Sequence, residues 1–404
     1  MSALPTKNTN AFSWERVLMS MQSNWSFPTD VRFGAGRIRE LPQALRDAGI
    51  RNPLFVTDQG LASLPITTST LDILRDAGMA AAVFSDVRAN PVLKGVEDGV
   101  RMFREGKHDG VIAFGGGSAL DTGKTIAFMA HQKGTLWDYD FLNGYWDRAD
   151  PAAIAPFVTV PTTAGTGSDV GRGAMITDEA THTKKVVFHP LMRAKVVVAD
   201  PELTVGMPQF ITVGTGMDAL AHCIESLSSA YYHPMCDAIA VEGVRLIFEN
   251  LPKAYSNPDD IEARGHMMSA AAMGAVAFQK GMGAVHALSH PVGALYDTHH
   301  GMTNGVFLPY VMIANRSAIE DKIARLASYI GLPRTFDAFL EALISLRTRL
   351  GVPHTLVGLK VNGERRDEIA EMAIIDSCAP ENPVELTREL ALEIFDRALE
   401  GRLN

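Results

Sequence analysis

The chain has few cysteines, no signal-peptide pattern and no long apolar run. Its three cysteines are Cys223, Cys236 and Cys378, and their spacing matches neither a zinc ribbon nor a disulfide framework. Reduced thiols and a polar stretch over Met1–Asn10 predict a cytoplasmic protein. A membrane span needs roughly 18 consecutive apolar residues, which are absent here. We therefore expect no membrane partner.

Clusters of basic residues are also missing. Lys and Arg number 37 against 46 Asp and Glu, so the formal net charge is −9. This balance argues against a nucleic-acid partner. The hydrophobic content of 47% and charged content of 21% are those of an ordinary globular protein. Because 404 residues exceed what one domain usually holds, two domains are predicted.

Strand and helix patterns alternate in the first half of the chain, and helical patterns dominate the second half. The alternation predicts a doubly wound, mostly parallel sheet. Strand-like patterns become rare after Asp200-Pro201. We therefore expect an α/β nucleotide-binding domain over residues 1–203 and an all-α metal-binding domain over residues 204–404. The expected strands include residues 53–58, 110–114, 157–160, 185–188 and 195–199.

Histidines are concentrated in one apolar stretch. It holds His286, His290, His299 and His300, four of the chain's 12 histidines. His286 and His290 are four positions apart and would share one face of a helix. The small apolar neighbours predict burial, and an unpaired buried polar group costs about 1–3 kcal/mol. A metal ion is one partner that would satisfy such imidazoles.

A second pair of possible ligands lies upstream. Asp218 and His222 are also four apart on an expected helix. Alone they would be read as an ordinary helix pair, but the second histidine cluster favours a metal site. Asp218, His222, His286 and His300 together offer one oxygen and three nitrogen ligands. That set suits Fe(II) or Zn(II) better than Mg²⁺ or Ca²⁺.

Two glycine-rich loops follow expected strands. Gly115-Gly116-Gly117-Ser118 opens a helix, where bare backbone N–H groups and the helix dipole favour a pyrophosphate. The alternative is a tight turn without a ligand. Gly123-Lys124 would lie inside the helix, which excludes a P-loop. Pro161–Ser168, rich in Thr and Gly, could bind ribose or phosphate.

Asp58 stands at the end of an expected strand. An acid at this position can accept from the ribose 2′-hydroxyl and repel a 2′-phosphate, which favours NAD over NADP. The competing interpretation is an N-cap for the following turn.

These motifs together resemble the iron-containing (group III) alcohol dehydrogenases from Phe27 to about Glu400. The strongest carriers are Gly115–Lys124, Pro161–Ser168, Asp218–His222 and His286–Pro291. The resemblance implies a dehydroquinate synthase-like architecture with a cleft between the two domains. It also implies hydride transfer between NAD(H) and a primary alcohol or aldehyde, Fe(II) as the metal with Zn(II) as the alternative, and a homodimer.

The resemblance also implies roles for individual residues. Asp218, His222, His286 and His300 become the metal ligands, and His290 becomes a catalytic histidine near the nicotinamide. The chain departs from the family pattern in three places: Asp169 stands where Glu is usual, Gly171-Arg172-Gly173 replaces bulkier residues, and the segment from Phe278 to His286 is one residue shorter than the family's. The implied cofactor-binding residues are Asp58, Asn90, Gly116, Gly117, Ser118, Thr162, Thr163, Thr166 and Lys185.

The substrate pocket is read from residues 169–176. A strand there would place Asp169, Gly171 and Gly173 on one face, giving a roomy neutral pocket with Arg172 pointing away. The alternative turns Arg172 inward to bind a carboxylate, so that the substrate is an ω-hydroxy acid such as 4-hydroxybutyrate.

Rival functions are a metal-dependent lyase or cyclase, a metal-free reductase of the maleylacetate type, and a non-catalytic binding protein or filament.

Overall fold

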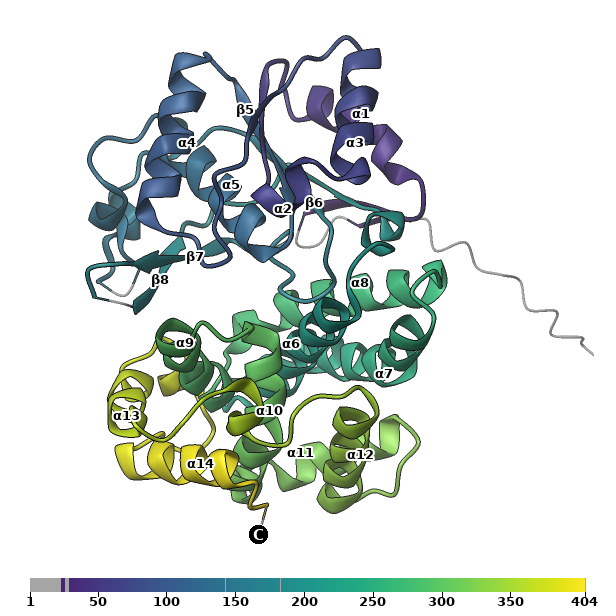
Figure 1. The fold of residues 1–404 in the computed structure, drawn as a ribbon, viewed down its shortest axis with the longest axis vertical. Helices are drawn as coiled ribbons and strands as arrows, with labels where there is room; N and C mark the ends of the chain where they lie inside the picture. Colours follow the sequence, from purple (N-terminus) through teal and green to yellow (C-terminus); the bar gives the residue numbers. More distant parts are fainter. Residues whose placement is uncertain (1–22, 26–28, 142, 182, 404) are drawn as a thin grey trace, which may run out of the picture.

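The computed structural model describes Ser23–Trp25 and residues 29–403 except positions 142 and 182. Figure 1 shows an α/β half, drawn in purple to blue, above a helical half drawn in green to yellow. The predicted fold class is confirmed: a parallel sheet flanked by helices precedes an all-helical region. Among the described residues, no helix is both long and apolar enough to cross a membrane.

The main sheet has seven strands in the order β1-β2-β9-β6-β5-β3-β4. All described pairings in it are parallel except that of β1 with β2. The four central strands are buried on both faces, as expected for Val-, Ile- and Phe-rich runs in a parallel sheet. The strands are β1 (Ser23–Trp25), β2 (Asp30–Phe33), β3 (Pro53–Val56), β4 (Ala82–Phe84), β5 (Gly110–Gly115), β6 (Phe157–Pro161) and β9 (Val196–Ala199).

Helices cover both faces of this sheet. Neighbouring strand residues alternate between two apolar clusters: Leu54 and Val111 face one, whereas Phe55 and Ile112 face the other. The helices of this half are α1 (Leu41–Asp47), α2 (Gln59–Ala62), α3 (Pro65–Asp76), α4 (Leu93–Glu105) and α5 (Gly117–Met129). Helix α5 packs on β5, so the glycine-rich turn joining them lies at the carboxyl end of the sheet.

Two strand predictions were wrong, because the residues concerned lie in or before a separate two-stranded hairpin. β7 (Gly173–Asp178) and β8 (Thr183–Phe188) pair antiparallel with each other, so residues 185–188 do not join the parallel sheet. Residues 168–170 form a turn in which the Val170 amide donates to the Gly167 carbonyl at 3.1 Å. Asp169 and Gly171 therefore precede the strand and do not share a strand face with Gly173. The hairpin reaches the helical half, where β8 lies against α9.

The helical half is built around α6 (Gln209–Ser228). Residues 212–228 of α6 are all buried, because other helices pack against every side of it. The remaining helices are α7 (Pro234–Ser256), α8 (Ile261–Ala277), α9 (Ala284–Tyr296), α10 (His300–Ala314), α11 (Arg316–Tyr329), α12 (Phe336–Arg349), α13 (Arg366–Ile374) and α14 (Arg388–Glu400). Short 3-10 helices are η1 (Arg37–Glu40), η2 (Leu136–Tyr139), η3 (Tyr145–Arg148), η4 (Pro151–Ala153), η5 (Pro201–Thr204), η6 (Phe278–Lys280), η7 (Leu356–Leu359) and η8 (Ala379–Glu381).

Candidate metal and cofactor site

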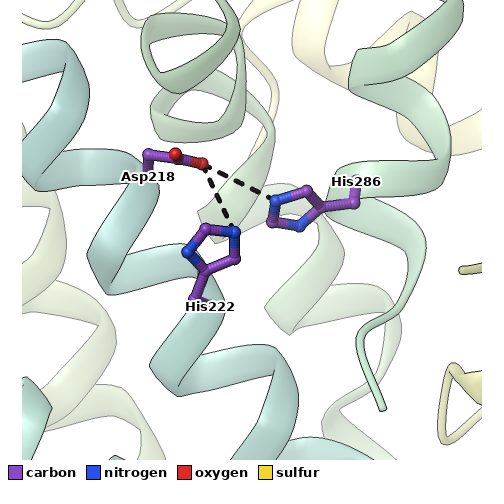
Figure 2. A group of neighbouring side chains, drawn as sticks. All are labelled: Asp218, His222 and His286. Atoms are coloured by element: carbon purple, nitrogen blue, oxygen red, sulfur yellow. Dashed lines mark ion pairs between the residues drawn. The ribbon is translucent and has the colours of Figure 1, made fainter. Parts of the chain in front are cut away.

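Four side chains from three helices converge on one buried point. Helix α6 supplies Asp218 and His222, α9 supplies His286, and α10 begins at His300. The Asp218 Oδ1 atom lies 3.7, 3.6 and 3.4 Å from the Nε2 atoms of His222, His286 and His300. Figure 2 shows Asp218, His222 and His286 pointing toward one another. One carboxylate and three imidazoles at this spacing fit a divalent transition metal.

The protonation states of Asp218 and His222 also fit a cation. Burial alone would raise the pKa of Asp218, but the His222 and His300 imidazoles hold it below its usual range. Burial lowers the pKa of His222 to about 4, and Asp218 opposes this only in part. An ionised carboxylate and a neutral imidazole are the forms that bind a metal.

Glu225 orients His286 and was missed by the sequence analysis. Its Oε2 atom accepts from His286 Nδ1, and its Oε1 atom accepts from the Val285 amide at 2.8 Å. Burial acts to lower the pKa of His286, but Glu225 and Asp218 outweigh it and raise the pKa to about 10. With Nδ1–H held by Glu225, Nε2 is the ring nitrogen left to face a metal. A signal was present, because Glu225 follows Asp218 by seven positions on the same helix face.

His299 and His300 have different roles despite being neighbours. The His299 side chain caps α10, accepting from the Met302 amide at 3.3 Å, and its ring packs edge-on against Phe210. His300 lines the central cavity beside Asp218 and His290.

His290 forms a dyad with Asp376. The His290 Nδ1 atom lies 2.8 Å from Asp376 Oδ2, and the His290 ring stacks on that of His300 with centroids 5.4 Å apart. Burial would raise the pKa of Asp376, but His290 and the Cys378 amide keep it lowered. His290 lines the cavity, and with Nδ1 engaged its Nε2 is available there. Asp376, in the connection after α13, was not predicted.

The two glycine-rich loops lie against each other at the start of α5. A Cβ atom added at Gly116 would come within 3.1 Å of Thr163, and one at Gly117 within 2.6 Å of Thr166. The Thr162 amide donates to the Gly115 carbonyl at 3.0 Å. A side chain at Gly117 would therefore displace Thr166, and Gly117, Ser118 and Thr166 line the cavity.

Lys124 takes no part in the cavity. It is fully buried, and its Nζ donates to the carbonyls of Ser168 and Gly173, which ties α5 to the turn before β7. This structural role is consistent with rejecting a P-loop.

Asp58 and Asn90 lie near the loops, each with a protein partner. Asp58 caps α2, accepting from the Leu61 amide at 3.0 Å, as the alternative interpretation proposed. Its carboxylate also lies beside Gly115, at the carboxyl end of β3. Asn90 lines the cavity and donates to Asp297 at 3.2 Å, which joins the α/β half to the end of α9.

The structure does not bring Lys185 to the site. Its Nζ pairs with Asp178 at 2.8 Å and lies over the Trp137 ring. Lys184, one position earlier on β8, lines the cavity instead because successive strand residues face opposite sides. Burial lowers the pKa of Lys184, while Asp218 and other carboxylates oppose that shift.

The cavity has a volume of about 280 Å³ and combines the candidate metal ligands, the cofactor loops and an apolar wall. Met175, Val186, Phe278 and Met282 form part of that wall, and Gly171 and Gly173 also line it. Arg172 is exposed and lies 5.7 Å from the Phe188 ring, outside the cavity. This agrees with the neutral-pocket interpretation.

Comparisons with known proteins agree with the geometry. Residues 28–201 match the family model described as iron-containing alcohol dehydrogenase, and residues 212–399 match that of the Fe-containing alcohol dehydrogenase family, C-terminal. The chain is 38% identical to 4-hydroxybutyrate dehydrogenase from Cupriavidus necator, over 88% of this chain and 94% of that protein.

Two solved structures are similar over nearly the whole chain. A 1,3-propanediol oxidoreductase is 34% identical with a TM-score of 0.86, covering 91% of this chain and 97% of the other. Sulfoacetaldehyde reductase from Bifidobacterium kashiwanohense, solved with NAD⁺, is 27% identical with a TM-score of 0.83, covering 93% and 98%. The chain therefore belongs to the iron-containing alcohol dehydrogenase family, and it is an NAD-dependent oxidoreductase that acts on alcohols.

Proposed function

We propose that the protein oxidises a primary alcohol with NAD in the cavity between residues 1–203 and residues 204–404. The reaction uses a divalent metal, Fe(II), held by Asp218, His222, His286 and His300. The observation that carries the proposal is the convergence of these ligand atoms in the cavity that the glycine-rich loops also line. A metal held there would supply a Lewis acid for the substrate oxygen, and NAD would supply the hydride acceptor.

His290 accepts the proton of the substrate hydroxyl. Its Nδ1–H is donated to Asp376, so that Nε2 can accept a proton from the cavity. Imidazole is the side chain that most often serves as general acid and base in enzymes. Asp376 holds the ring in one orientation and stabilises the imidazolium that forms.

The chain's own residues also bind the dinucleotide. The backbone of Gly116, Gly117 and Ser118 at the start of α5 holds the pyrophosphate. Asp58 faces the adenosine ribose, and the hydroxyls of the second loop line the remaining nucleotide. The full set is Asp58, Asn90, Gly116, Gly117, Ser118, Thr162, Thr163 and Thr166, with Lys184 taking the place predicted for Lys185. Of these, Asn90, Gly117, Ser118, Thr166 and Lys184 line the cavity.

The substrate is a primary alcohol or diol with a neutral chain. The support is the apolar wall and the outward position of Arg172. An ω-hydroxy acid is the second candidate, favoured by the Lys184 ammonium in the cavity and by the relative named 4-hydroxybutyrate dehydrogenase.

Kinetics with matched substrates distinguish the two candidates. Rates with 1-butanol, 1,3-propanediol and 4-hydroxybutyrate are followed by nicotinamide absorbance in wild type, Arg172→Ala and Lys184→Ala, with metal content measured in each sample. Comparable losses on all substrates in Lys184→Ala support a cofactor role and the neutral substrate. A selective collapse of 4-hydroxybutyrate oxidation in either variant would support the second candidate. Wild type without bound metal or turnover would reject the proposed function.

We further propose a cytoplasmic homodimer. The three cysteines are free and buried, in keeping with a reducing compartment. Exposed apolar side chains in the α6–α7 connection (Tyr231 and Tyr232) and in the first turn of α7 (Met235) offer a surface for association. Light scattering of the purified enzyme measures the oligomeric state, and a monomer would reject the dimer.

A further inference from the structure

Asn304 lies among the ligand atoms of the candidate metal site. It is on α10, four positions after His300, so its amide and the His300 imidazole share one helix face. Its Nδ2 atom is 2.8 Å from Asp218 Oδ1 and 3.2 Å from the Nε2 atoms of both His286 and His300. The side chain is fully buried. One amide nitrogen thus contacts ligand atoms from α6, α9 and α10.

The orientation of this amide is set by its neighbours. Turning it over would place Asn304 Oδ1 against the Asp218 carboxylate, and two acceptors would then face each other. In the observed orientation Oδ1 is buried and has no hydrogen-bond partner, which is unfavourable. An arrangement that leaves this atom unsatisfied is explained if the N–H groups are needed at the ligand atoms.

We propose that Asn304 is a positioning residue for the metal ligands, an inference that rests on the proposed function. Its two N–H groups donate to Asp218 Oδ1 and to the neutral His300 imidazole beside His286, and hold these ligands in place before a cation arrives, so less ordering is required on binding. After binding, the imidazole lone pairs face the cation and the amide keeps only its bond to Asp218 Oδ1. That bond fixes the carboxylate oxygen nearest the three imidazoles.

The variants that test this inference remove the donor in two ways. Asn304→Leu keeps a similar volume without the N–H groups, and Asn304→Ala removes the group entirely in case Leu prevents folding. Asn250→Ala is the matched control. Asn250 is also buried and its Nδ2 donates to the Leu246 carbonyl at 2.9 Å, but it lies on α7 away from the ligands.

The readout is metal binding by the intact chain. Metal-free protein is titrated with Zn²⁺ against a chromophoric chelator and with Co²⁺, whose visible absorption reports the ligand geometry. Circular dichroism and thermal unfolding check the fold. We expect the Asn304 variants to bind Zn²⁺ 10–100-fold more weakly, as is usual when an outer hydrogen bond to a ligand is lost. The Co²⁺ spectrum should change in these variants and not in Asn250→Ala.

The outcomes separate this inference from the proposed function. His222→Ala shows whether the ions bind at the proposed site. If wild type binds neither ion, or if His222→Ala binds both as tightly as wild type, the proposed function fails. If wild type binds and the Asn304 variants show unchanged affinity and an unchanged Co²⁺ spectrum, the role of Asn304 is overturned. An equal loss in Asn250→Ala would also overturn it, because the effect would then follow from general destabilisation.

Discussion

Replacing Glu225 by Gln should weaken metal binding although the side chain keeps its shape. The Glu225 carboxylate accepts at two places, from the amides of Val285 and His286 and from the His286 ring. A glutamine amide has a single acceptor oxygen and adds two N–H groups. If the oxygen stays with the α9 backbone, the NH₂ group faces Nδ1 and forces the proton onto Nε2, where a metal would bind. If the amide turns over, its NH₂ group faces the backbone N–H groups.

Both orientations of the glutamine predict the same loss of metal affinity. Loss of a carboxylate that orients a ligating histidine typically weakens metal affinity by 10–100-fold, or about 1.4–2.8 kcal/mol. Glu225 is 4% exposed, so water cannot easily replace its oxygen. Turnover at limiting metal should fall in proportion to occupancy.

Chelator competition measures the affinity, with Glu381→Gln as the matched control. Glu381 accepts from the Met282 amide at 2.8 Å in the same region but contacts no candidate ligand. Unchanged metal affinity in Glu225→Gln would refute the role assigned to Glu225. The same loss in Glu381→Gln would show that the loop, and not the His286 tautomer, is responsible.

Three further predictions follow from the site. His222→Ala should remove both bound metal and turnover while circular dichroism stays native, and a variant that keeps its metal would contradict the ligand assignment. Asp58→Gly should improve catalytic efficiency with NADP relative to NAD, because like charges cost several kcal/mol in a binding site; no gain for NADP would reject that role. Burial raises the pKa of Asp169 to about 6 from 3.8, so the folded state holds its proton longer than the unfolded state. Ionisation of Asp169 therefore lowers the free energy of unfolding by about 3 kcal/mol as pH rises from about 4 to 6. Urea unfolding measured across this pH range should show this decrease in wild type and not in Asp169→Asn.

The sequence determined the parts of the molecule that depend on local spacing. Apolar runs between helical patterns are enough to predict a parallel sheet, because strands buried on both faces need no alternation. The positions of Asp218 and His222, four apart, place both on one helix face whatever surrounds the helix. The glycine-rich turn after β5 was likewise predictable, because three consecutive glycines separate a buried strand pattern from a helix pattern.

The tertiary structure decided which distant groups meet and which neighbour points inward. Glu225 and His286 are 61 positions apart, and His290 and Asp376 are 86 apart, so only the packing of α6, α9 and the α13 connection pairs them. One position along a strand reverses the face, which is why Lys184 and not Lys185 enters the cavity. One position on a helix turns the side chain by about 100°, which separates His300 from His299. Local pattern cannot choose between such neighbours, because each choice depends on where the whole element sits.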